Sequence, residues 1–309
     1  MGKVEVFCLT INTGSATIPP TNPGGLCVSG GIVIKLKKPV QVRYLEVQLK
    51  GVSKCQWSND DDSFVSTDVL IDLKQELIRS DESSPYVLNQ GSHKVPFVFQ
   101  TQADRHLPSS YAGPHGRIVY LLSARMSRFG VIFDEKSSFT IKVSNPLPLN
   151  LTLQLPAIAE QSHTDSCLCF TSRPIIVTAH INKCGLVIGS DETLQVSLTV
   201  DNMNGFEITP KVCIVEITKC LAGRSSQTCT KKLAVAQPGQ PIMPNTRNNK
   251  SSYVIGPIPP TVCGNIKSTR NIFVSYMVSV KMAGSGFKLL HPILIGKGQT
   301  GYPKYQFLG

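Results

Sequence analysis

Long apolar runs are missing from this sequence of 309 residues. No stretch approaches the roughly 18 uncharged apolar residues that a membrane-spanning helix needs. The first residues, MGKVEV, place Glu5 where the apolar part of a secretory signal would begin, so we expect no signal peptide. We therefore expect a protein that is made and kept in the cytosol.

Catalytic signatures are missing as well. The sequence contains no Gly-x-Ser-x-Gly elbow, no His-Glu-x-x-His and no phosphate loop ending in Gly-Lys-Ser/Thr. A cysteine-dependent enzyme stays an alternative, because Cys55 could meet His93 or His115 in the folded chain and would then need a markedly lowered thiol pKa. We expect no enzyme and no cofactor.

The ten cysteines lack the spacing of a metal site. His163, Cys167, Cys169 and Cys184 carry ligand types that suit zinc, but they form no Cys-x-x-Cys knuckle. A hydrophobic content of 41% over this length supplies packed cores without disulfide staples. We expect reduced, mostly buried thiols and no metal.

What the sequence does have is a hydrophobic pattern with a period of two. Apolar and polar residues alternate over 139–143, 194–200 and 272–282, as in strands with one buried face. Residues 70–78 come nearest to a helix, although they also fit a strand with its loop. The pattern predicts an all-β fold with enough strands for β-sandwiches.

The length predicts two domains. Residues 156–166 have little apolar content and no alternation, so we predict an exposed linker there. The first domain would cover residues 1–155, the second would cover 167–296, and a short tail would cover 297–309.

The first domain has a change of hydrophobic parity. Val40 and Val42 share one parity and Leu45 and Val47 take the other, which predicts a β-bulge at Tyr44–Leu45. Several cations then point outward and form a basic patch on one face of the first sheet, and the alternative is that they are merely a solvated edge. These candidate partner- or anion-binding residues are Lys35, Lys37, Arg43, Lys50 and Lys54.

The formal net charge of +11 favours acidic partners such as phosphorylated receptor tails or anionic lipid heads. Nucleic acid would also fit the charge, but it requires stacking aromatics within the patch, and Tyr44 and Trp57 are the aromatic residues nearby. We therefore expect no nucleic-acid partner.

Between residues 91 and 126, two alternating strands surround a Leu-Pro-Ser-Ser-Tyr-x-Gly-x-x-Gly turn. This stretch resembles the central signature of the arrestin-domain-containing (α-arrestin) branch of the arrestin family. The order of shorter motifs agrees over nearly the whole chain, and in the second half Arg173 and Ile188 replace the usual glycine and proline. The residues that carry the resemblance are Gly51, Val52, Trp57, Phe97, Phe99, Leu107–Tyr111, Gly116 and Tyr120 in the first half, and Cys167–Ile175, Leu186–Gly189, Glu192, Asn202, Ile258–Pro260, Cys263, Tyr276 and Pro292–Gly296 in the second.

The resemblance implies two immunoglobulin-like β-sandwiches, the arrestin N- and C-domains, joined by a short linker. It also implies an adaptor that recruits HECT-type ubiquitin ligases through Pro-Pro-x-Tyr motifs in a long C-terminal tail. The Pro-Pro pairs at 19–20 and 259–260 lack tyrosine at the fourth position, and the chain ends soon after the second domain. Residues 4–11 contain no basic residue, so a phosphate-sensing switch on the first strand is not expected.

These observations predict a non-catalytic cytosolic adaptor or scaffold that binds membrane receptors or transporters as cargo. It would link them to endocytic sorting or ubiquitination machinery, at the plasma membrane or at endosomes, with peripheral contact to anionic membrane. The alternative is a retromer-like structural coat subunit in endosomal trafficking, which would share the fold and have a permanent partner.

Overall fold

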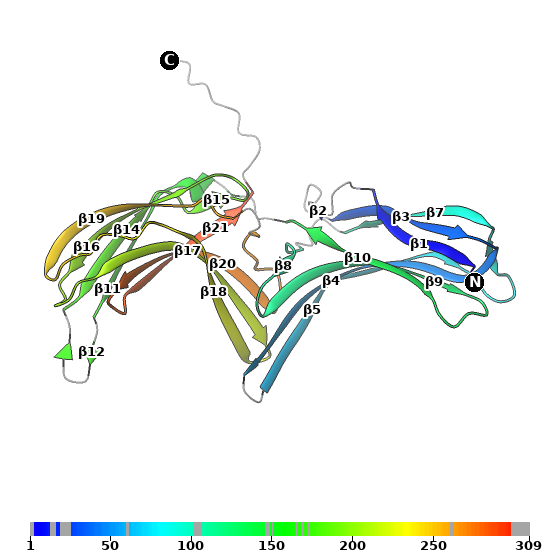
Figure 1. Ribbon diagram of the computed structural model, residues 1–309, viewed down its shortest axis with the longest axis horizontal. Coiled ribbons are helices and arrows are strands. Elements are labelled where there is room, and N and C mark those ends of the chain that lie inside the picture. The colour runs from blue at the N-terminus through cyan, green and yellow to red at the C-terminus, as the bar shows by residue number, and fades with distance from the viewer. Residues whose placement is uncertain are drawn as a thin grey trace, which may run out of the picture. The chain divides into compact units, whose positions relative to one another are not determined.

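The computed structural model describes residues 3–12, 17–18, 26–59, 62–101, 107–145, 149, 151–164, 166–167, 170–171, 173–259 and 263–297. The chain forms two compact units, each built from β-sheets (Figure 1). The first unit contains residues 1–145 together with 220–227 and 267–272, and the second contains the remaining residues.

The first unit is a sandwich of two sheets. A three-stranded sheet has the order β1 (Val4–Ile11), β3 (Cys27–Leu36), β7 (Gly91–Gln100). The larger sheet has the order β2 (Thr17–Ile18), β10 (Glu135–Val143), β9 (Gly116–Arg128), β4 (Val40–Asn59), β5 (Asp62–Arg79), with β6 (Tyr86–Leu88) beside β4 and β8 (Tyr111–Ala112) beside β9.

The core of this unit consists of apolar side chains at alternate positions of both sheets, because each strand buries one face and exposes the other. Fully buried examples are Ile32, Ile34, Leu45, Leu49 and Leu122. Residues 70–78 lie within strand β5, so the helical alternative for this segment is wrong.

The structure has the predicted bulge in β4, one residue earlier than Tyr44–Leu45. Val42 lies opposite Arg128 and Tyr44 lies opposite Ser127 of β9, so Arg43 is the extra residue. The nearby register shift with β5 has its extra residue on β5, between Glu76 and Ile78. The extra residue moves the buried face from the parity of Val42 to that of Leu45, as the hydrophobic pattern required.

The second unit has two main sheets. One has the order β11 (Ala157–His163), β14 (Ile175–Ile181), β16 (Leu194–Asn202), β19 (Thr246–Ile255). The other has the order β15 (Gly185–Val187), β21 (Lys288–Gly296), β20 (Ile272–Ala283), β17 (Thr209–Ala222), β18 (Ser225–Val235). A small hairpin joins β12 (Ser166–Cys167) to β13 (Phe170–Thr171), and a 3-10 turn, η1, covers Leu151–Gln154. Two β-sandwich domains are therefore the fold of the chain, and the described residues contain no α-helix.

The predicted linker needs a correction. Most of residues 156–166 form β11, which pairs along its whole length with β14. The segment is polar because β11 lies at a sheet edge and exposes much of its surface, with Ile158 67% exposed. The domain boundaries at 155 and 167 stay a prediction, and residues 298–309 of the predicted tail lie outside the described residues.

Each unit contains a buried tyrosine that donates its hydroxyl to a backbone carbonyl earlier in the chain. Tyr120 Oη donates to the carbonyl of Pro108 at 2.7 Å, and Tyr276 Oη donates to the carbonyl of Cys263 at 2.7 Å. Burial raises the pKa of both phenols, so both stay protonated donors over the physiological range.

We expect Tyr120→Phe and Tyr276→Phe each to lower the unfolding free energy of their own unit by about 1–3 kcal/mol, because a buried carbonyl loses its donor. Thermal unfolding followed by circular dichroism measures the loss. Tyr86→Phe is the matched control, since Tyr86 is 50% exposed. Equal melting temperatures for all three variants and the parent would contradict the structural role of these two hydroxyls.

Candidate functional site

The five cations predicted as one basic patch lie on two different sheets. Lys35 is on β3 of the three-stranded sheet, and Lys37 is in the turn that follows it. Arg43, Lys50 and Lys54 are on β4 of the larger sheet. The outer faces of the two sheets of a sandwich point in opposite directions, so the single patch is a wrong prediction. The reason is that the chain crosses from one sheet to the other between Leu36 and Val40.

Three of these cations have an acidic neighbour. The Nζ atom of Lys35 lies 3.5 Å from a carboxylate oxygen of Glu5. Arg43 lies 3.7 Å from Glu82, and Lys50 lies 3.7 Å from Asp72. Such exposed pairs contribute little stability, but they reduce the positive charge that a partner would meet.

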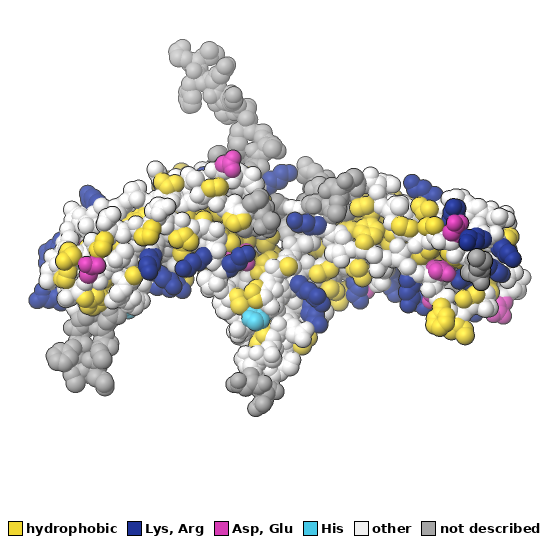
Figure 2. All heavy atoms as spheres, in the orientation of Figure 1, with side chains coloured by type: hydrophobic (Ala, Val, Ile, Leu, Met, Phe, Trp, Pro, Cys, Tyr) yellow, Lys and Arg dark blue, Asp and Glu magenta, His cyan; other side chains and the backbone are white. Residues whose placement is uncertain are grey.

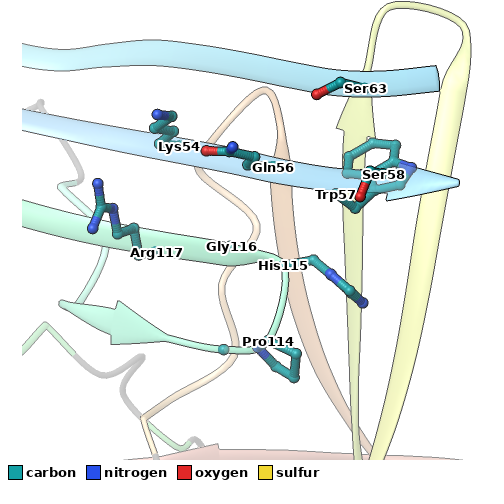
Figure 3. Close-up of a pocket in the computed structure, with 10 residues that line it drawn as sticks. Lys54, Gln56, Trp57, Ser58, Ser63, Pro114, His115, Gly116 and Arg117 are labelled. Atoms are coloured by element: carbon teal, nitrogen blue, oxygen red, sulfur yellow. The ribbon is translucent and has the colours of Figure 1, made fainter. Parts of the chain in front are cut away.

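Lys54 differs, because no described acidic side chain forms an ion pair with it. The register of β4 with β9 places Arg117 directly opposite Lys54, and the register with β5 places Thr67 on its other side. Residues directly opposite in neighbouring strands share a face, so Lys54 and Arg117 form a cation pair on the outer face of the larger sheet. Figure 3 shows both side chains extending in the same direction from adjacent strands.

Lys54 and Arg117 line an open pocket of about 450 Å³. Its remaining lining comes from the far end of β4, the start of β5 and the turn before β9, where the Gly113 amide donates to the Gly116 carbonyl at 2.8 Å. The lining residues are Lys54, Gln56, Trp57, Ser58, Ser63, Gly113, Pro114, His115, Gly116 and Arg117 (Figure 3). Guanidinium, ammonium, amide and hydroxyl groups together can donate to a carboxylate or a phosphate.

The row next to the cation pair is apolar. Val52 lies opposite Val119 on one side and opposite Val69 on the other. Val69 and Val65 on β5 are each 53% exposed, and Leu121 is 40% exposed. This outer face therefore offers donors for one acidic group beside a small apolar surface, which suits an acidic peptide segment that also carries apolar side chains.

A second pocket lies at the other end of the same face, with a volume of about 690 Å³. Its charges are mixed: Arg43, Arg79 and Arg125 stand beside Glu46, Glu76, Asp81 and Glu82. Since the signs are interspersed, this pocket has no marked preference for an anion.

The Cys–His pairs considered from sequence are not activated. Cys55 is buried and its thiol donates to the Asn271 carbonyl at 3.0 Å, while burial raises its pKa. His93 Nε2 lies 2.8 Å from the Asn89 carbonyl, and His115 lines the pocket. A thiol with a raised pKa stays protonated at neutral pH and is a poor nucleophile.

The structure brings together one Cys–His pair that sequence reasoning missed. Cys184 Sγ lies 3.5 Å from His291 Nε2 in the second unit. Burial raises the pKa of Cys184 and lowers the pKa of His291. Both shifts favour the neutral forms, whereas a catalytic pair would need thiolate and imidazolium.

Of the four zinc-ligand candidates from the sequence, the structure describes the side chains of His163 and Cys184. The side chains of Cys167 and Cys169 lie outside the described residues, and the His163 ring packs 6.4 Å from the Phe287 ring. Among the side chains that are described, no three metal-binding groups come together.

No helix in the described part of the chain is long and apolar enough to cross a membrane.

Arg117 is the site residue that sequence reasoning missed. It lies more than sixty positions from Lys54 along the chain, and strand register rather than spacing places the two side by side. The signal that could have found it is the alternation after Gly116, which puts Arg117 on the outer face.

Comparison with known families agrees with this fold. Residues 21–150 match the family described as "Arrestin (or S-antigen), N-terminal domain", and residues 171–297 match the corresponding C-terminal domain. Human arrestin domain-containing protein 1 is 27% identical over 216 residues, which is 69% of this chain and 46% of that protein. Human arrestin domain-containing protein 4 is 24% identical over 290 residues, covering 88% of this chain and 67% of that protein.

Arrestin domain-containing protein 17 of Caenorhabditis elegans is 25% identical over 207 residues, which is 62% of this chain. The chain spans about half the length of the first relatives that it matches. Both family domains follow in order along the chain, and each falls on one of the two β-sandwiches. The chain therefore belongs to the arrestin-domain-containing (α-arrestin) proteins.

Proposed function

We propose that this protein is a non-catalytic adaptor of the cytoplasm that binds membrane-protein cargo and links it to endocytic sorting or ubiquitination machinery. The observation that carries the proposal is the Lys54–Arg117 pair on the outer face of β4 and β9, within a fold of the adaptor family. Cargo would be receptors or transporters with acidic cytoplasmic segments.

The proposed binding face has the properties that an acidic segment needs. An arginine binds a carboxylate or phosphate with two parallel hydrogen bonds, and the adjacent lysine adds a second positive charge. The neighbouring valines would contact apolar side chains of the same segment. The strands fix the backbone positions of these residues, so binding has to order the Lys54 and Arg117 side chains but not the chain that carries them.

Ligase recruitment would not use a Pro-Pro-x-Tyr motif of these 309 residues, because none is present. HECT-type ligases stay among the proposed partners, and these residues would contact them through a surface of another kind. We place the protein at the plasma membrane or at endosomes, where such cargo is sorted.

We expect the variant Lys54→Glu/Arg117→Glu to lose most of the membrane proteins that the parent captures from detergent-solubilised membranes. Reversing both charges replaces attraction by repulsion at the contact, so we expect at least a tenfold loss in recovered cargo. Quantitative mass spectrometry of the captured proteins provides the measurement. Lys35→Glu/Lys94→Glu carries the same change of net charge on the three-stranded sheet and serves as the control.

Two results would contradict this proposal. Equal capture by both variants and the parent would remove the cation pair from the binding surface. A single stoichiometric partner complex recovered with all three proteins would favour the structural coat subunit instead.

A further inference from the structure

The turn between β9 and β10 of the first unit is unusually apolar. Surface hairpin turns are mostly built from Gly, Asn, Asp and Ser, yet four of the six residues between Arg128 and Glu135 are apolar. Ile132 is 93% exposed and Phe133 is 81% exposed. Figure 2 shows hydrophobic side chains protruding where this hairpin turns in Figure 1. Two neighbouring side chains with this exposure mark an interaction site rather than a folding requirement.

The base of the turn is held firmly. The Phe129 amide donates to the Gln41 carbonyl at 3.1 Å, and the Arg43 guanidinium lies 5.3 Å from the centre of the Phe129 ring. Arg128 bonds Glu135 at 2.7 Å across the two strands. Phe129 is therefore held by the sheet, whereas the Ile132 and Phe133 side chains beyond it are almost fully exposed.

The acidic groups of this hairpin are neutralised. Asp134 forms an ion pair with Arg125 and accepts a hydrogen bond from Tyr44 at 3.1 Å. Burial raises the pKa of Asp134. Hydrogen bonds from Arg125, Ser127 and Tyr44 outweigh this effect, so the pKa of Asp134 lies below its usual value. Asp134 therefore stays ionised and paired with its arginine.

Three lysines lie at the same end of the unit. The Lys37 amide donates to the Lys3 carbonyl at 2.9 Å, and Lys38 is three residues before Gln41, which bonds the turn. Lys3, Lys37 and Lys38 are exposed, and no described acidic side chain forms an ion pair with them. Acidic groups of the adjoining loop are Asp81, which accepts from Ser83 and Ser84, and Glu82, which pairs with Arg43.

We propose that this end of the first unit docks on an anionic phospholipid membrane. Ile132 and Phe133 enter the boundary between headgroups and acyl chains, and Lys3, Lys37 and Lys38 contact the negative headgroups. Apolar side chains that protrude next to cations are the combination that binds a protein to a charged bilayer surface.

The shape of the surface favours a bilayer over a second copy of the chain. A protruding tip needs an apolar groove if it binds a protein, but it can enter a fluid interface without one. The two pockets described above are lined mainly by charged and polar groups, so neither offers such a groove. Membrane docking also does not depend on the proposed cargo face, because the two surfaces use different residues.

The test is sedimentation of the full chain with phosphatidylcholine vesicles that contain 30% phosphatidylserine, compared with vesicles of phosphatidylcholine alone. We expect the parent to bind the anionic vesicles. Ile132→Ser/Phe133→Ser should weaken binding about tenfold or more, since both apolar contacts are lost. Lys37→Glu/Lys38→Glu should weaken it by roughly fivefold or more per residue.

Matched controls separate a local contact from general hydrophobicity and charge. Ile158→Ser/Val254→Ser removes two exposed apolar residues of the second unit, and Lys231→Glu/Lys232→Glu reverses two exposed lysines on β18. We expect both controls to bind like the parent. Binding that is unchanged in the Ile132/Phe133 variant, or absent in the parent, would overturn the proposal. Concentration-dependent dimerisation that this variant abolishes would assign the tip to a second copy of the chain and overturn it too.

A fluorescence probe locates the insertion directly. The chain has one tryptophan, Trp57, which is 5% exposed, so Phe133→Trp adds one solvent-exposed reporter. On anionic vesicles its emission should shift to shorter wavelength and be quenched by lipids brominated in their acyl chains. Bound protein with no shift and no quenching would show that the tip stays in water, and would contradict the proposal.

Discussion

Gly30→Ala, which adds a single methyl group, is expected to lower the unfolding free energy of the first unit by about 3 kcal/mol. A Cβ at residue 30 would collide with the carbonyl oxygen of Thr10 and lie 2.7 Å from Cζ of Phe97. The Phe97 ring is buried and the Thr10 carbonyl is backbone, so neither can move without disturbing the sheet of β1, β3 and β7. Overpacking at such a position costs about 1–3 kcal/mol and more where backbone must shift.

Thermal unfolding followed by differential scanning calorimetry tests this expectation, with a drop of roughly 6–12 °C for a unit of this size. Gly205→Ala is the control, because a Cβ there has no atom within 4 Å. A melting temperature of Gly30→Ala within about 2 °C of the parent would correspond to a loss of at most ~1 kcal/mol in unfolding free energy. That result would contradict the close approach of β1 to β3.

Asn271→Leu is expected to have an effect of similar size, also about 3 kcal/mol in the first unit. The Asn271 side chain is 2% exposed, and its amide donates to the carbonyls of Ser53 at 3.1 Å and Ser66 at 3.2 Å. Its amide oxygen accepts from the Ser53 hydroxyl. Leucine has nearly the same shape but neither donates nor accepts, so buried polar groups of β4 and β5 lose their partners.

A double-mutant cycle isolates the amide–hydroxyl contact. Ser53→Ala should be clearly destabilising in the parent and nearly neutral when Asn271 is already leucine. Asn89→Leu, at an exposed position, controls for the general effect of the substitution. Additive losses for Ser53→Ala and Asn271→Leu would contradict the coupling of these two side chains.

Local hydrophobic pattern was enough to predict much of the fold. The change of parity between Val42 and Leu45 predicted the bulge, because a strand cannot exchange its buried face without an extra residue. The turn motif at Leu107–Tyr111 indicated the family, which the matches over both domains support. Residues 70–78 stayed ambiguous because a short segment with apolar residues can fit both a helix and a strand.

The errors have a common physical origin in the pairing of distant strands. The prediction of a single basic patch was wrong because sequence alone does not tell whether two successive strands join the same sheet. Strands β3 and β4 join different sheets. Arg117 was missed because its neighbour Lys54 is fixed by strand register. Strand β11 was taken for a linker because an edge strand can be as polar as a loop.

The most direct test of the proposed cargo face is photo-crosslinking from single positions on opposite sheets. A photoreactive amino acid at Val69 on β5 would lie beside the Lys54–Arg117 pair, and one at Val98 on β7 has nearly the same exposure, 56% against 53%. Illumination in the presence of membranes should crosslink cargo membrane proteins from position 69 and leave position 98 unreacted. Crosslinks to cargo from position 98 alone, or equally from both positions, would contradict the assignment of the cargo face to the larger sheet.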